Sequence, residues 1–392
     1  MTDTKAHYDV VIIGGAVIGS AVAYFLTANP DFSGSVLIIE RDPTFEWAST
    51  ALSAAGIRHQ FSNAINVKIS QFGTDFIRRA PKTLGVDLGL HEQGYLFLAK
   101  TPGQVKILQT NHAVQRGEGA DVVLLDRTQL AQQFPHLNVA DIEMASWGQS
   151  GEGWFDNTGL MNAFRGTARA AGAAFTVGEV VAITRKADRI EAVTFADDRV
   201  ITCGSLVNAS GPRASQTAQM ADLALPVEPR KRTVFAFDCQ NNPAGALPLM
   251  IDPTGVWSRP EGHQFITGCT PLNDNAVDFD DFEPDYDQFE HIIWPTLAER
   301  SPAFEAIKMT RAWAGHYAYN TLDHNVVVGP HNDVSNFIFA NGFSGHGLQQ
   351  SPAIGRGVAE WLTYGAYRTL DLTPLGYERV IRNEPFLERA II

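Results

Sequence analysis

The sequence predicts a mixed α/β protein with two domains, one a Rossmann-type nucleotide-binding domain and the other an α+β domain that is mainly antiparallel sheet. Two observations carry this prediction. The first 40 residues read as a strand–helix–strand unit with a glycine-rich first turn, which is typical of dinucleotide-binding folds. Segments 86–145 and 226–310 are richer in aromatic residues and prolines and alternate polar with apolar positions, as antiparallel strands do.

The N-terminal unit can be placed element by element. Residues 9–13 are a short apolar, β-branched run, which predicts a buried strand. Residues 20–28 are apolar on nearly every face and predict a buried helix, which Asn29-Pro30 ends. Residues 35–39 predict a second buried strand, and Glu40 stands at its carboxyl end.

The turn after the first strand carries the motif GGAVIG, whose members are Gly14, Gly15, Ala16, Val17, Ile18 and Gly19. Glycines let the backbone approach a pyrophosphate, and the amides at a helix N-terminus attract its charge. Glu40 follows Gly19 by 21 positions, close to the ~20 expected of an acid that binds a ribose. Because Ala16 replaces the middle glycine, we expect the diphosphate or the loop to be displaced slightly.

This fingerprint alone does not separate NAD from FAD, and a closely packed unit without a ligand would share it. The chain contains one such fingerprint, whereas a flavin enzyme that also uses a nicotinamide usually carries two. The pattern therefore leaves two readings, NAD with an unusual second domain or FAD alone.

Two later blocks extend the nucleotide-binding domain. Residues 160–171 predict a helix and 205–211 a buried strand with a small-residue turn. Residues 337–340 predict another strand, followed by a glycine-rich loop and a helix over 351–362. We therefore expect one discontinuous nucleotide-binding domain from 1–85, 146–225 and 311–392, and a second domain from 86–145 and 226–310.

Composition and charge argue against several classes of protein. A net charge of −13 argues against nucleic acid as a partner, and the lack of a long apolar run predicts no membrane span. The polar N-terminus and three cysteines without a CxxC motif predict a cytoplasmic protein. No residue spacing matches a metal site, so no metal is expected. The acidic run 278–287 predicts a solvated loop.

Five further motifs are more specific. They are ERDP at 40–43, ASTALSAAGIR at 48–58, GEGW at 151–154, VNASGP at 207–212 and GFSGHGLQ at 342–349. Together they resemble the FAD-dependent amine and amino-acid oxidoreductases, the superfamily of D-amino acid oxidase, glycine oxidase, sarcosine oxidase and dimethylglycine dehydrogenase. Residues 313–321 and 371–392 resemble most closely a branch of it that acts in mitochondrial complex I assembly.

The resemblance implies FAD as the cofactor and assigns its contacts. The ADP half would be held by residues 14–19 with Glu40 and Arg41, and the adenine by Val180. The pyrophosphate, ring edge and ribityl chain would be lined by Ser49, Thr50, Ser53, Gly56, Ala209, Ser210 and Gly211. The pyrimidine edge would be surrounded by Gly342, Ser344, Gly345, His346, Gly347, Leu348 and Gln349.

The residues expected to act on substrate are Arg58, Arg259, Tyr317, His346 and Gln349. Arg58 follows the flavin-contacting turn and would face the flavin or the substrate. Arg259 either binds a substrate carboxylate or forms a surface ion pair, and His346 either packs or acts chemically. In sarcosine-oxidase-type sites the resemblance places an Arg and a Lys where this chain has Phe61 and Gln349, so Phe61 is expected to add apolar pocket surface.

The resemblance implies an FAD-dependent oxidoreductase that oxidises the C–N bond of a secondary or N-substituted amine or amino acid by hydride transfer to the flavin. Two alternatives stay open, a 2-hydroxy-acid dehydrogenase and an FAD-containing assembly factor without turnover. Three electron acceptors stay open, namely oxygen, a quinone and an electron-transfer protein. FAD is expected to be non-covalent, because Ser53 stands where related enzymes attach it through His and no Cys follows Cys269.

Overall fold

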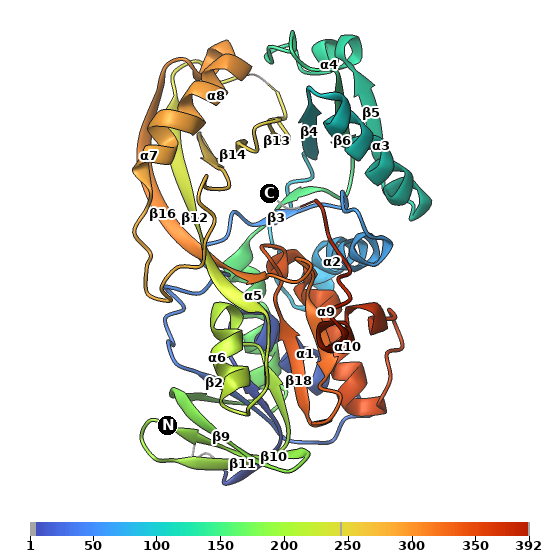
Figure 1. Cartoon of the computed structure of the whole chain (residues 1–392), viewed down its shortest axis with the longest axis vertical. Helices are drawn as coiled ribbons and strands as arrows, with labels where there is room; N and C mark the ends of the chain where they lie inside the picture. Colours follow the sequence, from blue (N-terminus) through green and yellow to red (C-terminus); the bar gives the residue numbers. More distant parts are fainter. Residues whose placement is uncertain (1–4, 244, 391–392) are drawn as a thin grey trace.

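The structure, a computed structural model, describes residues 5–243 and 245–390. Two large β-sheets dominate it, one in each half of the elongated molecule (Figure 1). The mixed α/β class expected from the sequence is confirmed. The last two residues of the stretch 371–392, Ile391 and Ile392, lie outside the described residues.

The first sheet is largely parallel and is built around β1. Its strands, in spatial order, are β17 (Val327–Pro330), β18 (Phe337–Asn341), β11 (Val200–Asn208), β1 (His7–Ile13), β2 (Val36–Glu40) and β8 (Ala174–Val177), with β10 (Arg189–Phe195) and β9 (Val180–Lys186) added antiparallel beside β11. β1 pairs in parallel with both β11 and β2. The carboxyl ends of these parallel strands therefore share one edge, which is where open α/β sheets bind ligands.

Helices cover one face of this sheet because alternate strand residues point to opposite sides. Val10 and Ile12 pack under the helices, whereas Val11 and Ile13 face the β9–β10 side. The covering helices are α1 (Val17–Thr27), α2 (Ala64–Thr83), α5 (Asn157–Ala170) and α9 (Gly347–Tyr364). The short helices α6 (Ala214–Gln219) and α10 (Glu378–Arg382) complete this half.

The second sheet is antiparallel except for one parallel pair of strands near its middle. Its spatial order is β16 (Ile307–Asn320), β12 (Val227–Cys239), β15 (Gln264–Gly268), β14 (Trp257–Glu261), β13 (Leu249–Ile251), β4 (Tyr95–Ala99), β6 (Met144–Gly148) and β5 (Val122–Asp126). The parallel β13–β4 pair unites strands from the two aromatic-rich segments. Helices α3 (Pro102–Gly117), α4 (Arg127–Gln133), α7 (Tyr286–Gln288) and α8 (Trp294–Arg300) lie around it.

A two-stranded ladder, β3 (Gly56–Ile57) with β7 (Gly153–Trp154), lies between the two large sheets (Figure 1). The second sheet extends to Gly148 and Asn320, whereas the expected segments end at 145 and 310, so most of β16 lies beyond the second limit. The domain boundaries themselves stay a prediction. Among the described residues, we find no helix with the length and apolarity needed to cross a membrane.

Gly355 on α9 packs directly on α1 and offers a test of the helix layer. A Cβ built at Gly355 would lie 2.7 Å from the Cβ of Ala21, so we expect Gly355→Ala to lower the free energy of unfolding by about 1–3 kcal/mol. On α5, a Cβ at exposed Gly166 meets no atom within 4 Å. Gly166→Ala is the matched control and should be neutral or stabilise by up to ~1 kcal/mol. Urea unfolding measures both, and equal losses would contradict the close packing.

Candidate active site

A cavity of about 350 Å³ lies at the junction of the two halves. The first sheet contributes the carboxyl ends of β1 and β2 and the residues after β11, including Gly14, Glu40 and Ala209. The second sheet contributes β12 and β16, including Arg232 and Tyr317. The cavity is therefore bounded by both halves, as expected for a cofactor on one side and a substrate on the other.

The β1–α1 turn requires glycine for steric reasons. Gly14 has a φ of +101°, and a Cβ there would lie 2.3 Å from the carbonyl oxygen of Ala209. A Cβ at Gly19 would lie 1.9 Å from the carbonyl oxygen of Gly14. The N-cap residue of α1, Ala16, makes no side-chain capping bond. The turn thus brings the start of α1 to the cavity wall, where helix amides can receive a diphosphate.

Glu40 is held in place at the end of β2. Its Oε2 accepts a hydrogen bond from the Gly15 amide at 2.7 Å, and its Oε1 accepts one from the Asp42 amide at 2.9 Å. Because two backbone amides fix this carboxylate at the cavity wall, it suits a pair of ribose hydroxyls. This observation fits the adenosine half of a dinucleotide.

The start of α9 forms another wall of the cavity. Ser344 and Gly345 have positive φ angles of 48° and 95°, and a Cβ at Gly345 would lie 2.5 Å from the Tyr317 ring. The loop turns tightly against β16, and α9 then begins at Gly347. The N-terminus of this 18-residue helix offers positive potential to the cavity.

Arg58 is a buried cation on the cavity wall, with 1% of its surface exposed. Its guanidinium donates to the carbonyl oxygens of Gln60 and Ala390 and to His346 Nε2, the last at 2.9 Å. Its charge lies 4.2 Å from the centroid of the Phe61 ring. Among the described residues, no carboxylate forms an ion pair with Arg58.

Burial and the neighbouring Arg58 also determine the protonation state of His346. Burial, and then the neighbouring guanidinium, hold the pKa of His346 well below its usual value. The imidazole is therefore neutral. Since a guanidinium can only donate, Nε2 accepts and the imidazole proton lies on Nδ1. Gln349 adjoins this pair, because its Oε1 accepts a hydrogen bond from the Arg58 amide at 2.9 Å.

Most of the residues predicted for the site meet at this cavity. Its lining includes Gly14, Ala16, Val17, Ile18, Glu40, Arg41, Ser49, Thr50, Ser53, Gly56, Arg58, Val180, Ala209, Ser210, Gly211, Tyr317, Gly345, His346, Gly347, Leu348 and Gln349. Four predicted residues, Gly15, Gly19, Gly342 and Ser344, lie behind the lining. Gly15 and Gly19 shape the first turn through the contacts described above, and Ser344 Oγ accepts a bond from the Asn320 amide at 3.0 Å.

Two residues expected on the substrate side do not line the cavity, and for Arg259 the ion-pair alternative is the one seen. Arg259 does not line the cavity, because its guanidinium bonds the Ala54 carbonyl at 2.8 Å and pairs with Glu261. Arg259 thus supports the turn that carries Ser53. Phe61 does not line the cavity either, and its ring lies under Arg58 rather than adding apolar pocket surface.

The acidic run 278–287 is largely exposed, as the sequence predicts, but two of its carboxylates also form ion pairs. Asp281 pairs with Lys231 at 2.7 Å, and Asp280 pairs with Arg213 at 2.7 Å. The Phe282 ring stacks on His316 with 4.3 Å between centroids, and both rings line the cavity. These contacts place Phe282 at the cavity, while most acidic side chains of the loop stay exposed to water.

Glu152 in the GEGW motif is a structural residue that sequence reasoning missed. It is fully buried, and burial raises its pKa to about 7 against the opposing hydrogen bonds. Its oxygens accept from the His59 amide at 2.7 Å and from Gln60 Nε2 at 2.9 Å. Glu152 therefore holds the segment that follows Arg58. An acid between two glycines gives no sequence signal of burial.

The described residues also include cavity-lining side chains that no motif marked, namely Tyr95, Trp257, Cys269 and Phe279. Among these same residues we find no cluster of three or more potential ligands for a metal ion. The site offers a glycine turn, an anchored carboxylate and two helix N-termini, a donor set that fits FAD.

Comparisons with known proteins agree with this geometry. Residues 9–361 match the family described as DAO, FAD dependent oxidoreductase. FAD-dependent oxidoreductase domain-containing protein 1 of Xenopus laevis is 41% identical, and the match covers 98% of this chain and 85% of that protein. The 4-methylaminobutanoate oxidase (formaldehyde-forming) of Paenarthrobacter nicotinovorans is 24% identical over 92% of this chain and 44% of its own.

Among solved structures, the L-proline dehydrogenase from P. horikoshii superposes with a TM-score of 0.87 at 26% identity, covering 97% of this chain and all of the other. The family model and the Xenopus relative each span nearly the whole chain. The chain therefore belongs to the DAO family of FAD-dependent oxidoreductases, and FAD is its cofactor.

Proposed function

We propose that the protein oxidises the C–N bond of a secondary or N-substituted amino acid. The observation that carries the proposal is the buried guanidinium of Arg58, which reaches the cavity and has no ion pair with any carboxylate of the residues that the structure describes. A buried cation whose hydrogen bonds go only to neutral acceptors favours an incoming anion. A substrate carboxylate supplies that charge.

The relatives support this substrate class. The names 4-methylaminobutanoate oxidase and L-proline dehydrogenase describe enzymes for N-substituted or cyclic amines that carry a carboxylate. An amine and a carboxylate suit this cavity, because its wall is largely apolar and its two buried cations differ in pairing. Arg232 pairs with Asp274, whereas Arg58 has no ion pair with a carboxylate of the described residues.

FAD supplies the hydride-accepting chemistry when it is bound. The residues proposed to hold it are the β1–α1 turn, Glu40, the turn around Ser53 and the loop before α9. The α9 N-terminus stabilises negative charge that develops nearby. Arg58 binds the carboxylate and so orients the α C–H bond, and Tyr317 and Gln349 form the polar wall around it.

The hydrogen bonding of His346 favours an amine over a 2-hydroxy acid as the substrate. A hydroxy acid must lose its hydroxyl proton, which calls for a general base. His346 Nε2 already accepts a hydrogen bond from Arg58, so its lone pair is occupied. An amine that binds unprotonated needs no base to release a hydride, and the products are an imine and then, by hydrolysis, a carbonyl compound and an amine.

The experiment that tests this function is an anaerobic titration of the holoenzyme. We expect L-proline or N-methyl amino acids to bleach the flavin absorbance, while the matching 2-hydroxy acids and primary amino acids do so at least tenfold more slowly. Faster bleaching by the hydroxy acids would support the dehydrogenase alternative. No bleaching across the panel would support a non-catalytic role for the FAD.

The Arg58→Met variant tests the carboxylate anchor. A charge-assisted hydrogen bond contributes roughly 1.5–3 kcal/mol, so KM for the acidic substrate should rise by about 10- to 100-fold. KM for the corresponding amide should change little. Steady-state kinetics with both compounds gives the comparison, and Arg311→Met, at an exposed position on β16, is the control. Equal increases for acid and amide would show that Arg58 does not bind the carboxylate.

FAD is predicted to be non-covalent. Ser53 lines the cavity at the position where related enzymes carry the attaching His. Burial raises the pKa of Cys269, a cysteine on the wall, to about 11, so its thiolate is scarce. Acid precipitation should leave the yellow colour in the supernatant. A coloured pellet would show a covalent bond.

A further inference from the structure

After α10 the chain returns to the active-site cavity. Residues Phe386–Ala390, which we call the C-terminal strap, have no regular secondary structure. Figure 1 shows this segment rising from α10 to the junction of the two halves. The strap crosses the start of α2 and reaches Arg58. Its attachment to the rest of the fold occurs at two buried carboxylates.

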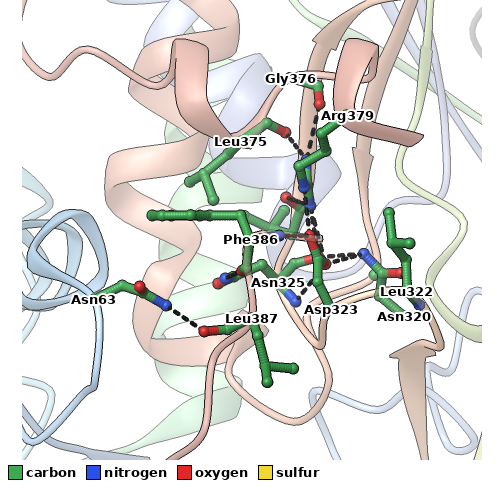
Figure 2. Close-up of polar contacts among 12 residues, drawn as sticks. Asn63, Asn320, Leu322, Asp323, Asn325, Leu375, Gly376, Arg379, Phe386 and Leu387 are labelled. Atoms are coloured by element: carbon green, nitrogen blue, oxygen red, sulfur yellow. Dashed lines mark hydrogen bonds and ion pairs between the residues drawn. The ribbon is translucent and has the colours of Figure 1, made fainter. Parts of the chain in front are cut away.

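The first attachment is the Asp323–Arg379 pair (Figure 2). Arg379 Nε lies 2.6 Å from Asp323 Oδ2, and the same oxygen accepts the Phe386 amide at 3.0 Å. Asn325 Nδ2 donates to the Phe386 carbonyl oxygen. One fully buried carboxylate thus ties α10 and the strap to the turn that follows β16, the strand that carries Tyr317.

The second attachment is Glu388, which is fully buried. Its Oε1 accepts from the amides of Ser62 and Ala390, both at 2.9 Å, and from Ser62 Oγ at 2.5 Å. Its Oε2 accepts from Asn66 Nδ2 at 2.8 Å and from Asn63 Nδ2 at 3.2 Å. Figure 2 shows Asn63 also bonded to the Leu387 carbonyl oxygen, at 3.0 Å. Among the described residues, the Glu388 carboxylate accepts hydrogen bonds only from neutral donors. It therefore fixes the path of the strap while the negative charge of Glu388 stays without an ion pair.

The strap ends at Arg58, the residue proposed to bind the substrate carboxylate. The Ala390 carbonyl oxygen accepts a hydrogen bond from the outer nitrogen NH2 of Arg58, which also donates to His346. With the bond to the Gln60 carbonyl oxygen, three of the five N–H donors of the guanidinium have protein acceptors. Among the described residues, the other two N–H groups, on Nε and NH1, have no hydrogen-bond acceptor. They point in different directions, so each can donate one hydrogen bond to a substrate carboxylate.

We propose that the C-terminal strap is a part of the substrate site, in which Glu388 is a positioning residue that acts through Ala390 to hold the guanidinium of Arg58 in the orientation that binds a substrate carboxylate. This inference rests on the proposed function. A guanidinium that loses one fixed acceptor can rotate, and its alignment with a planar carboxylate is lost. The strap therefore sets the preference for acids over amides.

Glu388→Gln tests the proposal, because it keeps the size of the side chain and places an amide among the donors of Ser62, Asn63 and Asn66. Glu384→Gln, in the exposed residues before the strap, is the matched control. Should Glu388→Gln fail to fold, Ser62→Ala is the milder variant, because Ser62 Oγ bonds both Glu388 and the Arg389 amide.

The first readout does not depend on turnover. Hydrogen exchange of the Ala390 and Arg389 amides should quicken at least tenfold in Glu388→Gln, and also in Arg58→Met, but not in Glu384→Gln. Unchanged exchange in both variants would overturn the inference, since the strap would then be uncoupled from Arg58.

The second readout is ligand binding to the holoenzyme, followed by flavin absorbance with anthranilate and its amide, 2-aminobenzamide. We expect Glu388→Gln to weaken anthranilate about tenfold and the amide less than twofold. If Arg58→Met abolishes the preference for the acid and Glu388→Gln leaves it intact, the strap proposal fails and the proposed function stands. If the wild-type protein binds anthranilate no more tightly than 2-aminobenzamide, both the strap proposal and the proposed function fail.

Discussion

The site depends on one constraint, the burial of the Arg58 charge between the two halves of the molecule. Its acceptors come from three distant parts of the chain, namely the segment between β3 and α2, the loop before α9 and the C-terminal strap. Glu152 and Glu388 add negative charge nearby without touching it. A cation is costly to bury. These groups together offset that cost, and the buried guanidinium can then bind an anion.

The nucleotide half was predictable because its requirements are local. A glycine at position 14 and an acid at position 40 are dictated by short-range geometry that a sequence displays directly. The spacing from Gly19 to Glu40 reflects the length of one strand–helix–strand unit. The mixed α/β class followed from the same apolar runs, with α9 beginning at Gly347, earlier than expected.

The substrate half was less predictable because its contacts are non-local. Arg259 and Arg58 look alike in sequence, yet the first bonds the Ala54 carbonyl behind the cavity and the second reaches the cavity itself. The acidic run 278–287 has a solvated composition, but its partners Lys231 and Arg213 lie on elements that no pattern connects to it. Pairings of this kind are set by sheet topology and cannot be read from spacing.

The strand order of the first sheet has a consequence for how the protein is made. β1 pairs with β11, and β11 pairs with β18, so neighbours in the sheet are separated by well over a hundred residues in the chain. A ribosome completes β1 long before the partners that cover its edge exist. Since β2 can cover only one edge of β1, the growing chain must leave the other edge unpaired until β11 is made near the middle of the sequence. During that interval, chaperones that shield exposed strand edges become most important.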